Sequence, residues 1–427
     1  MARLRNGAAL RPAHHVPAIL RRPAPWPIPP VWRNQSGMTT PRRDQVDIAI
    51  VGAGAVGLAA ALALAEGGHR IALLGPIPTH RDGRTVALLD GSWRLLGELG
   101  LHDALTDKAA PLAVMRLVDD TGSLFRQPPV EFRASEVGLP AFGWNVENAE
   151  LVAALAARLA TTAGVRHEPG LVSGITPDED GVLLSGEGFS LRASLVVGAD
   201  GRRSRVREAA GIAARDWDYP QSALTAIVAH ARDHRDVSTE FHTRKGPFTL
   251  VPLPGRRSSL VWLLDPAEAD EVAALDDAAF ARRVERQAHS LLGAMRLDGP
   301  RGRVPMGGLS VERFGAGRMV LVGEAAHVFP PIGAQGLNLG LRDVMALREA
   351  VGETSDPGTP AAVAAYDRAR QADVRLRTGA VDTLNRTLLT DLMPADLLRG
   401  AGLLALSRIG PLRRLVMRQG LAGGMAR

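Results

Sequence analysis

The stretch VDIAIVGAGAVGLAAALALAEGGHRIALLG, residues 46–75, constrains the fold of this chain more than any other part of its sequence. An apolar run over 48–51 leads into a Gly-x-Gly-x-x-Gly turn. An Ala- and Leu-rich segment then extends to Gly67-Gly68, and a second apolar run covers 71–74. This order predicts a strand, a tight turn, a helix and a second strand. It is the opening unit of a Rossmann-like α/β domain.

The three glycines of this turn have different expected functions. Gly52 permits the tight turn, Gly54 lets the backbone approach a pyrophosphate, and Gly57 allows the helix to pack closely on the strand. The helix would stabilise that anion at its N-terminus. The motif therefore predicts a dinucleotide site. Gly75 stands where an acid usually holds the adenosine ribose, so the motif alone leaves FAD and NAD open.

A second turn of this kind lies in LVVGADGRRSRVREAAG, residues 195–211. The apolar run 195–197 is followed by Asp200-Gly201, and several arginines precede a predicted helix. Two interpretations stay open. The segment is either a solvated turn with an arginine-rich face, or a turn that aims a carboxylate and cations at a bound nucleotide.

A third turn lies in RMVLVGEAAHVFPPIGAQGLNLGLRD, residues 318–343. A strand predicted over 319–322 ends at Gly323-Glu324, where a carboxylate can accept a hydrogen bond from a ligand hydroxyl. The loop PPIGAQG then presents backbone N–H groups at the start of a helix predicted over 337–350. This arrangement suits a delocalised negative charge. Taken alone, the segment is better explained as a structural loop.

Considered together, the three turns favour ligand binding over a purely structural loop, because all three follow strands and would converge on one extended ligand. FAD, with an adenine end and a flavin end, is long enough to touch all of them. The chain has no Cys, which excludes thiolate nucleophiles, iron–sulfur clusters and cysteine zinc sites. No HExxH-type His pair occurs either. We therefore predict no metal site, and redox chemistry that comes from an organic cofactor.

The joint pattern GxGxxG, GADGxxSxxR and G[DE]AAHxxxPxxxQGxNxGxxD resembles that of the FAD-dependent aromatic hydroxylases of the para-hydroxybenzoate hydroxylase superfamily. Within that superfamily the chain is most similar to the ubiquinone-biosynthesis hydroxylases. The resemblance runs from about Val46 to the C-terminus. It implies a monooxygenase that uses NAD(P)H and O2 to hydroxylate an aromatic ring through a flavin C4a-hydroperoxide. The favoured substrate is a prenylated phenol of ubiquinone biosynthesis.

The resemblance also implies which residues contact the cofactor. These are the glycine turn, an arginine after the second strand and the two later turns: Gly52, Gly54, Ala55, Gly57, Arg84, Asp200, Gly201, Gly323, Glu324, Gly336, Leu337 and Asn338. Ser204 and Arg207 would support the second turn. The flavin-facing loop would supply the catalytic positions Pro331, Gly333 and Gln335. No protein acid or base is assigned to the chemistry.

Four positions depart from the family pattern. Gly75 lacks the ribose acid, and Glu324 is one methylene longer than the usual Asp. Pro330 stands where the ubiquinone hydroxylases usually carry His. Ala334 replaces a usual Gly, so its backbone must avoid glycine-only dihedral angles. The last two changes bear on the substrate more than on FAD.

A run of β-like segments separated by Pro and Gly turns predicts a mostly antiparallel sheet over 217–305. The expected division of the chain is a basic leader over 1–42, an FAD-binding domain over 43–111, 146–216 and 306–350, a substrate-binding β domain over 112–145 and 217–305, and C-terminal helices over 351–427. Four aromatic residues are candidates to face the substrate ring, with ordinary sheet core as the alternative for each: Trp144, Phe241, Phe248 and Trp262.

The basic charge of the chain is concentrated at its start. Residues 1–43 hold eight of the 51 basic residues and no acid, which leaves 43 basic against 45 acidic residues. This near-neutral remainder argues against nucleic-acid binding. We expect the Pro-rich leader to be disordered. It is either a targeting segment or lies upstream of a translation start at Met38.

The segment 397–420 combines an apolar stripe with arginines and contains no acid. Such a segment either lies on an anionic membrane surface or packs on its own domain. No apolar run reaches the roughly 20 residues of a spanning helix. We expect a cytoplasmic protein, peripheral on the inner membrane face under the first interpretation. Its expected partners are an aromatic small molecule and O2, with a homodimer or a ubiquinone-biosynthesis complex as further candidates.

Three other functions remain compatible with these patterns. Two keep the fold: hydroxylation of a soluble aromatic compound, and an FAD-dependent reductase that does not activate oxygen. The third is a non-enzymatic nucleotide-binding scaffold. The patterns also leave open the ring position that is attacked, the choice between NADH and NADPH, and the oligomeric state.

Overall fold

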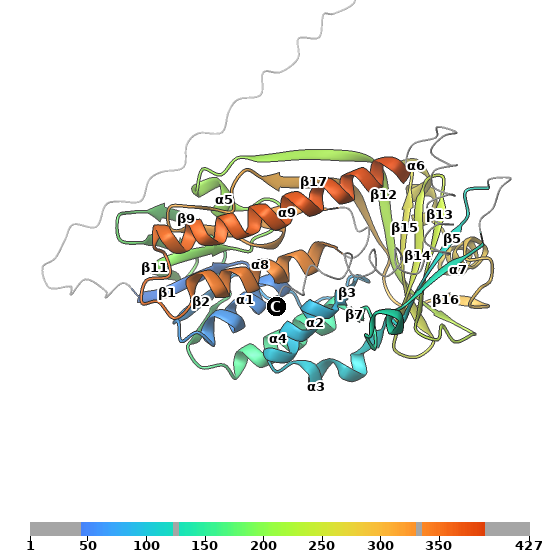
Figure 1. Cartoon of the computed structure of the whole chain (residues 1–427), viewed down its shortest axis with the longest axis horizontal. Coiled ribbons are helices and arrows are strands. Elements are labelled where there is room, and N and C mark those ends of the chain that lie inside the picture. The colour runs from blue at the N-terminus through green and yellow to red at the C-terminus, as the bar shows by residue number, and fades with distance from the viewer. Residues whose placement is uncertain (1–43, 123–127, 330–334, 389–427) are drawn as a thin grey trace, which may run out of the picture. The chain divides into compact units, whose positions relative to one another are not determined.

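The computed structural model describes residues 44–122, 128–329 and 335–388, with side chains as far as Val374. Figure 1 shows a first sheet around β1, β2 and β11, and a second sheet around β12, β14 and β15. The predicted fold class, a Rossmann-like domain with an interleaved, mostly antiparallel sheet and a C-terminal helical region, is confirmed.

The first sheet has a parallel core in the order β19-β11-β1-β2-β8. Antiparallel strands extend it at β11 and β19. Its strands are β1 (Asp44–Val51), β2 (Ile71–Leu74), β8 (Val165–Glu168), β9 (Val172–Pro177), β10 (Val182–Gly186), β11 (Phe189–Gly198), β18 (Gly315–Ala316) and β19 (Met319–Leu321). The three predicted turns follow β1, β11 and β19. Because these strands are parallel neighbours, the turns lie along one edge of the sheet.

Helix α1 (Ala55–Ala65) has no polar face, and its residues from Gly57 to Leu64 are buried. It contacts β1, β2 and two further helices, α4 (Asn148–Ala160) and α8 (Gln335–Val351). A helix that is apolar on all sides is expected to be buried in this way. The first turn of α1 is thereby held rigidly at the sheet edge.

Two predicted boundaries were wrong by one or two residues. Helix α8 begins at Gln335 rather than at Leu337, and β19 ends at Leu321 rather than at 322. Gly336 is a poor helix former, so the pattern alone placed the helix start after it. Packing of the helix on α1 and β3 overrides that local preference.

The second sheet has the order β20-β17-β12-β15-β14-β13-β5-β6, with β16 beside β12. All its pairs are antiparallel except β13 with β5. Its strands are β5 (Val114–Asp119), β6 (Val130–Arg133), β12 (Ala214–His230), β13 (Val237–Thr243), β14 (Gly246–Leu253), β15 (Arg257–Leu264), β16 (Met295–Leu297), β17 (Gly302–Val311) and β20 (His327–Val328). The predicted β-like runs are therefore strands, mostly antiparallel.

Helices α6 (Pro266–Ala273) and α7 (Asp277–Gln287) cover this sheet and complete a second apolar core. Phe241, Phe248 and Trp262 belong to that core, each at most 3% exposed. Phe248 makes edge-on ring contacts at 5.6 Å to Phe241 and 5.2 Å to Trp262. For these three aromatics, the burial supports the interpretation as sheet core.

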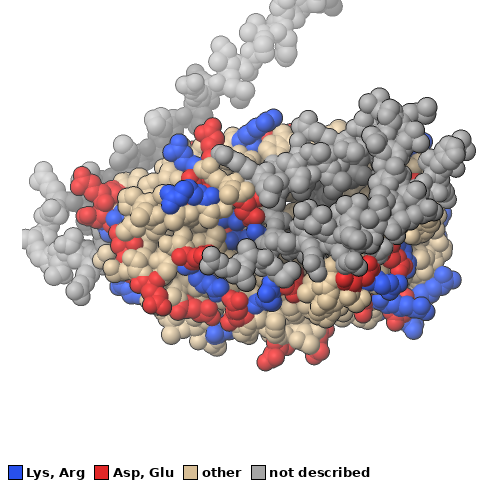
Figure 2. Space-filling view, in the orientation of Figure 1, with Lys and Arg blue, Asp and Glu red and all other residues tan. Residues whose placement is uncertain are grey.

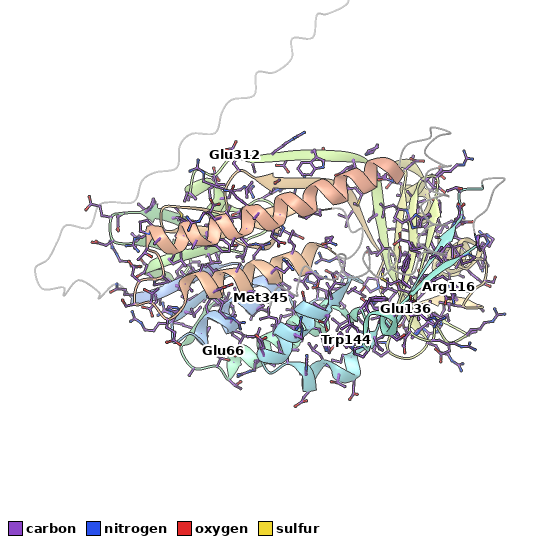
Figure 3. All side chains as sticks on the ribbon, in the orientation of Figure 1. Glu66, Arg116, Glu136, Trp144, Glu312 and Met345 are labelled. Carbon is purple, nitrogen blue, oxygen red and sulfur yellow. The ribbon has the colours of Figure 1, made fainter. Side chains whose placement is uncertain are left out.

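A third, three-stranded sheet lies beside the second sheet: β3 (Thr85–Leu89), β7 (Gly143–Glu147) and β4 (Ala109–Pro111). Around it are α2 (Asp90–Glu98), α3 (His102–Leu105), and the 3-10 turns η1 (Thr106–Lys108) and η2 (Ala134–Val137). Figure 3 shows Trp144 near the junction with the second sheet. Its ring stacks on Trp93 of α2 at 4.9 Å, so this aromatic is partly engaged in packing.

The remaining elements are α5 (Arg205–Ala209), η3 (Gly323–Ala325) and α9 (Pro360–Leu388). Helix α9 packs on α8, and the Tyr366 hydroxyl donates a 2.7 Å hydrogen bond to the carbonyl of Leu321. Residues 389–427, which include the predicted amphipathic segment 397–420, lie outside the described residues, as does the leader. Among the helices that are described, none is long and apolar enough to span a bilayer.

Acidic and basic side chains are intermingled on the face drawn in Figure 2. No large area of a single sign is visible among the described residues on that face. This distribution fits the near-neutral charge of residues 44–427.

Candidate cofactor and active site

A cavity of about 450 Å³ lies at the edge of the first sheet where β1, β11 and β19 end. Eight of the predicted cofactor residues line it: Gly54, Ala55, Arg84, Gly201, Gly323, Glu324, Gly336 and Leu337. They come from four segments that are far apart in the sequence. The three turns that were predicted to share a ligand therefore share a cavity.

Gly52 and Gly57 shape the first turn from behind the cavity. Gly52 has a φ of +107°, and a Cβ there would lie 2.3 Å from the carbonyl oxygen of Ala199. A Cβ on Gly57 would lie 1.9 Å from the carbonyl oxygen of Gly52. Both positions require glycine because backbone passes too close for any side chain.

Gly54 and Gly336 differ from those two glycines. Among the described residues, none has an atom within 4 Å of a Cβ placed at either position, and neither glycine has the left-handed backbone that favours glycine. The chain itself would tolerate a side chain at both sites. What a side chain would remove is cavity volume, so these glycines fit a ligand that lies against the backbone.

Three helices begin at this cavity. The first turns of α1, α4 and α8 contribute Ala55 and Val56, Asn148 and Ala149, and Gly336 and Leu337. Helices α1 and α4 have no side chain that caps their N-terminal N–H groups. Since the first N–H groups of a helix have no partner within the helix, and its dipole is positive there, the cavity suits an anionic ligand.

Asp200 lies behind the cavity, between the lining residues Ala199 and Gly201. Its Oδ2 accepts hydrogen bonds from the backbone N–H groups of Arg205 and Val206, at 2.7 and 3.2 Å. Its Oδ1 is buried and has no hydrogen-bond partner within the described residues. Such an acceptor is expected to find a donor in the complete protein, for example a ligand hydroxyl or a water.

The two supporting residues of the second turn have structural contacts. The Ser204 hydroxyl accepts a 2.9 Å hydrogen bond from the backbone N–H of Arg207 and so caps α5. The Arg207 guanidinium donates to the carbonyls of Ala325, at 2.9 Å, and Arg202, at 2.7 Å. Arg207 therefore joins the turn after β11 to the turn after β19.

Arg84 lines the cavity with a side chain that is about half exposed and bound to Asp82. Its Nε donates to Asp82 Oδ2 at 2.7 Å, and its backbone N–H donates to Oδ1 at 3.0 Å. Burial raises the pKa of Asp82, but the hydrogen bonds from Arg84 outweigh burial and leave that pKa below its ordinary value. Asp82 is thus charged at neutral pH and binds the Arg84 side chain beside the cavity.

The last predicted residues are not all at the cavity. Gln335 begins α8. Asn338 is buried, and its side-chain amide bridges to β3, donating to the carbonyl of Ala87 at 2.7 Å and accepting from the N–H of Leu89 at 2.9 Å. Asn338 does not line the cavity. Pro331 and Gly333, like the departures Pro330 and Ala334, lie outside the described residues.

A family model of the FAD binding domain matches residues 45–377, more than half of the chain. Ubiquinone hydroxylase UbiL of Rhodospirillum rubrum is 38% identical over 399 residues, covering 90% of this chain and 92% of that protein. The chain belongs to this family of FAD-dependent monooxygenases. A 3-demethoxyubiquinol 3-hydroxylase of Escherichia coli is 31% identical to it, covering 88% of this chain and 98% of that protein.

Solved structures agree with the fold of this monooxygenase. The p-nitrophenol 4-monooxygenase PnpA of Pseudomonas putida has a TM-score of 0.74 at 21% identity, covering 90% of this chain and all of that one. Klebsiella pneumoniae HpxO, solved with FAD and uric acid, has a TM-score of 0.72 at 21% identity and covers 88% and 97%. The resemblance to this family is confirmed, and FAD is the cofactor.

A buried charge cluster that none of the predictions from sequence included lies behind the Gly323-Glu324 turn of this monooxygenase. Asp343 on α8 is 0% exposed. It accepts hydrogen bonds from the Gly323 N–H at 2.8 Å, His327 Nε2 at 2.7 Å and Arg370 Nε at 2.6 Å. The cluster holds the turn so that Glu324 is exposed at the cavity. The sequence signal for this cluster was an acidic residue, Asp343, at a position of α8 that the apolar pattern places inside the protein.

The cluster continues to Asp373, which binds Arg342 through two hydrogen bonds of 2.9 and 2.7 Å and Arg370 through one of 2.7 Å. Burial raises the pKa of Asp373, but these hydrogen bonds and the Arg370 charge outweigh it and lower the pKa to about 2. Asp373 also ties α9 to α8, which carries part of the cavity.

We expect the free energy of unfolding to decrease as pH falls from 3.8, the ordinary pKa of an aspartate, through about 2. A carboxyl whose pKa is lowered by folding stabilises the protein above its unfolded pKa and loses that contribution as it becomes protonated. Urea unfolding at a series of pH values measures this slope. Asp373→Asn should flatten it, and an unchanged slope would contradict the assignment.

Proposed function

We propose that this FAD-dependent monooxygenase uses NAD(P)H and O2 to hydroxylate an aromatic ring, with a prenylated phenol of ubiquinone biosynthesis as its substrate. The observation that carries the proposal is the convergence of three helix N-termini and two sterically unconstrained glycines on one cavity. The substrate class is supported by the names of the relatives, a ubiquinone hydroxylase and a 3-demethoxyubiquinol 3-hydroxylase.

Different lining residues would contact different parts of FAD. Gly54 and Ala55, at the start of α1, would receive the pyrophosphate, with Arg84 supplying a positive charge. Glu324 would accept hydrogen bonds from ribityl hydroxyls. Gly336 and Leu337, in the first turn of α8, would lie beside the flavin ring with the positive end of that helix toward it. Gln335, Pro331 and Gly333 would complete this loop as the predicted catalytic positions.

FAD, when bound, supplies the redox chemistry, taking a hydride from NAD(P)H and activating O2. The protein contributes orientation and electrostatics. The helix N-termini at the cavity would stabilise negative charge on the cofactor without reorganising. No described residue is assigned as acid or base.

One domain would bind FAD and a second would bind the substrate. The first sheet with α1, α4, α5 and α8 would form the FAD-binding domain over 43–111, 146–216 and 306–350. The second sheet would form the substrate domain over 112–145 and 217–305, followed by the C-terminal helices over 351–427. For a prenylated substrate, the basic segment 397–420 would bring a cytoplasmic enzyme to the inner membrane face. A homodimer or a ubiquinone-biosynthesis complex would suit the same location.

Product labelling tests this function. Purified protein loaded with FAD is mixed with NADH or NADPH, ¹⁸O2 and either a prenylated phenol or a small benzoate. We expect faster NAD(P)H oxidation with the prenylated phenol and one ¹⁸O atom in the product. A preference for the benzoate would indicate a soluble aromatic substrate. Bleaching of the flavin without product labelling would indicate a reductase, and failure of NAD(P)H to bleach it would contradict the proposal.

A further inference from the structure

Glu147, the last residue of β7, has an unusual position for a carboxylate. It is 7% exposed and precedes α4 as its N-cap residue, yet its side chain does not cap that helix. Each carboxylate oxygen instead binds a different arginine. Oε1 accepts from Arg257 Nη2 at 2.8 Å, and Oε2 lies 2.9 Å from Arg81 Nη2.

The two arginines belong to different parts of the fold. Arg81 lies in the segment 76–84 between β2 and β3, and four residues of that segment line the cavity: Pro78, His80, Asp82 and Arg84. Arg257 begins β15 of the second sheet. Its Nε also donates to Asp298 Oδ2 at 2.6 Å. One buried carboxylate therefore joins the rim of the cavity to the second sheet.

Neighbouring hydrogen bonds hold the end of β7 in the same way. The Asn145 side-chain amide donates to the Pro252 carbonyl at 2.8 Å and to the Ser259 hydroxyl at 3.2 Å, both in the second sheet. The Asn148 backbone N–H donates to the Arg84 carbonyl at 3.0 Å. Figure 1 shows β7 near the second sheet, beside α2 and α4.

The ion pair between Glu147 and Arg257 is expected to persist at neutral pH, because Arg257 remains charged. Burial lowers the pKa of Arg257, but hydrogen bonds with Glu147 and Asp298 outweigh it and raise that pKa. Arg257 therefore stays charged and needs its acidic partners. Removing the Glu147 charge would leave a half-buried arginine less well paired, and the segment 76–84 would lose its tie to the second sheet.

We propose that Glu147 is a positioning residue for the cofactor. Its ion pair with Arg81 fixes the position of the segment 76–84, which carries Arg84. Its ion pair with Arg257 fixes that segment against the second sheet. None of the three bridging residues lines the cavity. The proposal rests on FAD occupying the cavity, as stated in the proposed function. It predicts that FAD affinity depends on Arg257, a residue of the other sheet.

The test compares Glu147→Gln with Glu150→Gln in the FAD-loaded protein. Glu150 lies three residues further along, in the first turn of α4, and undergoes the same charge change. Its nearer partner is Lys108 at 2.8 Å, whereas Arg81 is 3.8 Å away. Dissociation constants for FAD come from the recovery of flavin fluorescence on dilution. We expect Glu147→Gln to weaken FAD binding about tenfold or more, and Glu150→Gln by less than about threefold.

Arg257→Gln and Arg81→Gln separate positioning from a purely structural contribution. Both should weaken FAD binding and alter the absorption spectrum of the bound flavin. Added to Glu147→Gln, either should have little further effect, because all three residues act through one bridge. Arg81 is largely exposed, so its variant keeps the test valid if Glu147→Gln does not fold.

Three outcomes would overturn the inference. One is a Glu147→Gln protein that loses thermal stability but binds FAD as the Glu150→Gln control does. Another is an Arg81→Gln protein with unchanged FAD affinity, and the third is an Arg257→Gln protein with unchanged affinity. Wild-type protein that retains no FAD would instead contradict the proposed function, so the two failures are distinguishable.

Discussion

Gly54→Asp is expected to weaken FAD binding at least about a hundredfold while the FAD-free protein keeps its fold. The new side chain would enter the cavity, because Gly54 lines it and no described residue has an atom within 4 Å of a Cβ at that position. Its carboxylate would stand at the N-terminus of α1, where the pyrophosphate is expected, and would repel that anion.

The same carboxylate should not damage the protein. Asp is a preferred N-cap residue and interacts favourably with the positive end of a helix. Gly54 already has an extended backbone, with φ −75° and ψ −178°, that an Asp can adopt. We therefore expect the thermal midpoint of the FAD-free variant to equal or exceed that of the wild type.

Two variants complete this experiment. Gly54→Ser also caps the helix but adds no charge, so it should weaken FAD binding less than Gly54→Asp does. Gly52→Ala should fail to fold, because its Cβ would lie 2.3 Å from the Ala199 carbonyl oxygen. A Gly54→Asp protein that is purified with a full complement of FAD would show that the cofactor lies elsewhere.

Arg370→Met is expected to destabilise the protein by about 3–5 kcal/mol, the usual cost of removing one partner from a buried ion pair. Arg370 is 3% exposed and donates a 2.6 Å hydrogen bond to Asp343, which is fully buried. Without the guanidinium, Asp343 keeps its bonds to the Gly323 N–H and His327 but loses its cationic partner. The free energy of unfolding in urea at neutral pH measures the effect.

An exposed pair gives the matched control. Arg70 binds Asp47 at 2.7 Å with its own side chain 61% exposed, so Arg70→Met should cost less than about 1 kcal/mol. Adding Asp343→Asn to Arg370→Met should recover part of the lost stability, since it removes the uncompensated charge. Equal losses for Arg370→Met and Arg70→Met would contradict a structural role for the buried pair.

The parts of the fold that could be predicted depend on short stretches of sequence. The strand, turn and helix around 46–75 were identified because apolar periodicity and glycine spacing are local properties. The antiparallel nature of the second sheet followed from short β-like runs with turns between them. The meeting of the three turns at one cavity was also predicted, since they follow strands whose ends lie along one sheet edge.

The contacts of individual side chains could not be predicted, because a motif does not specify which way each residue points. Asn338 belongs to the cofactor loop motif, but its amide binds the backbone of β3. Phe241, Phe248 and Trp262 were candidates for the substrate pocket, and they pack under α6 and α7 instead. These orientations depend on neighbours that are distant in sequence.

By itself, the sequence determined the class of fold, the cofactor and the family, because glycine spacing and strand order are encoded locally. Only the tertiary structure separated Gly52 and Gly57, which the backbone requires, from Gly54, which it does not. Only it revealed Glu147 between Arg81 and Arg257, and Asp343 beneath the Gly323 turn. The physical reason is the same in both cases. Steric contacts and buried ion pairs join residues that are far apart in the sequence, such as Glu147 and Arg257, which are 110 positions apart. A local sequence pattern does not indicate which distant residues are in contact.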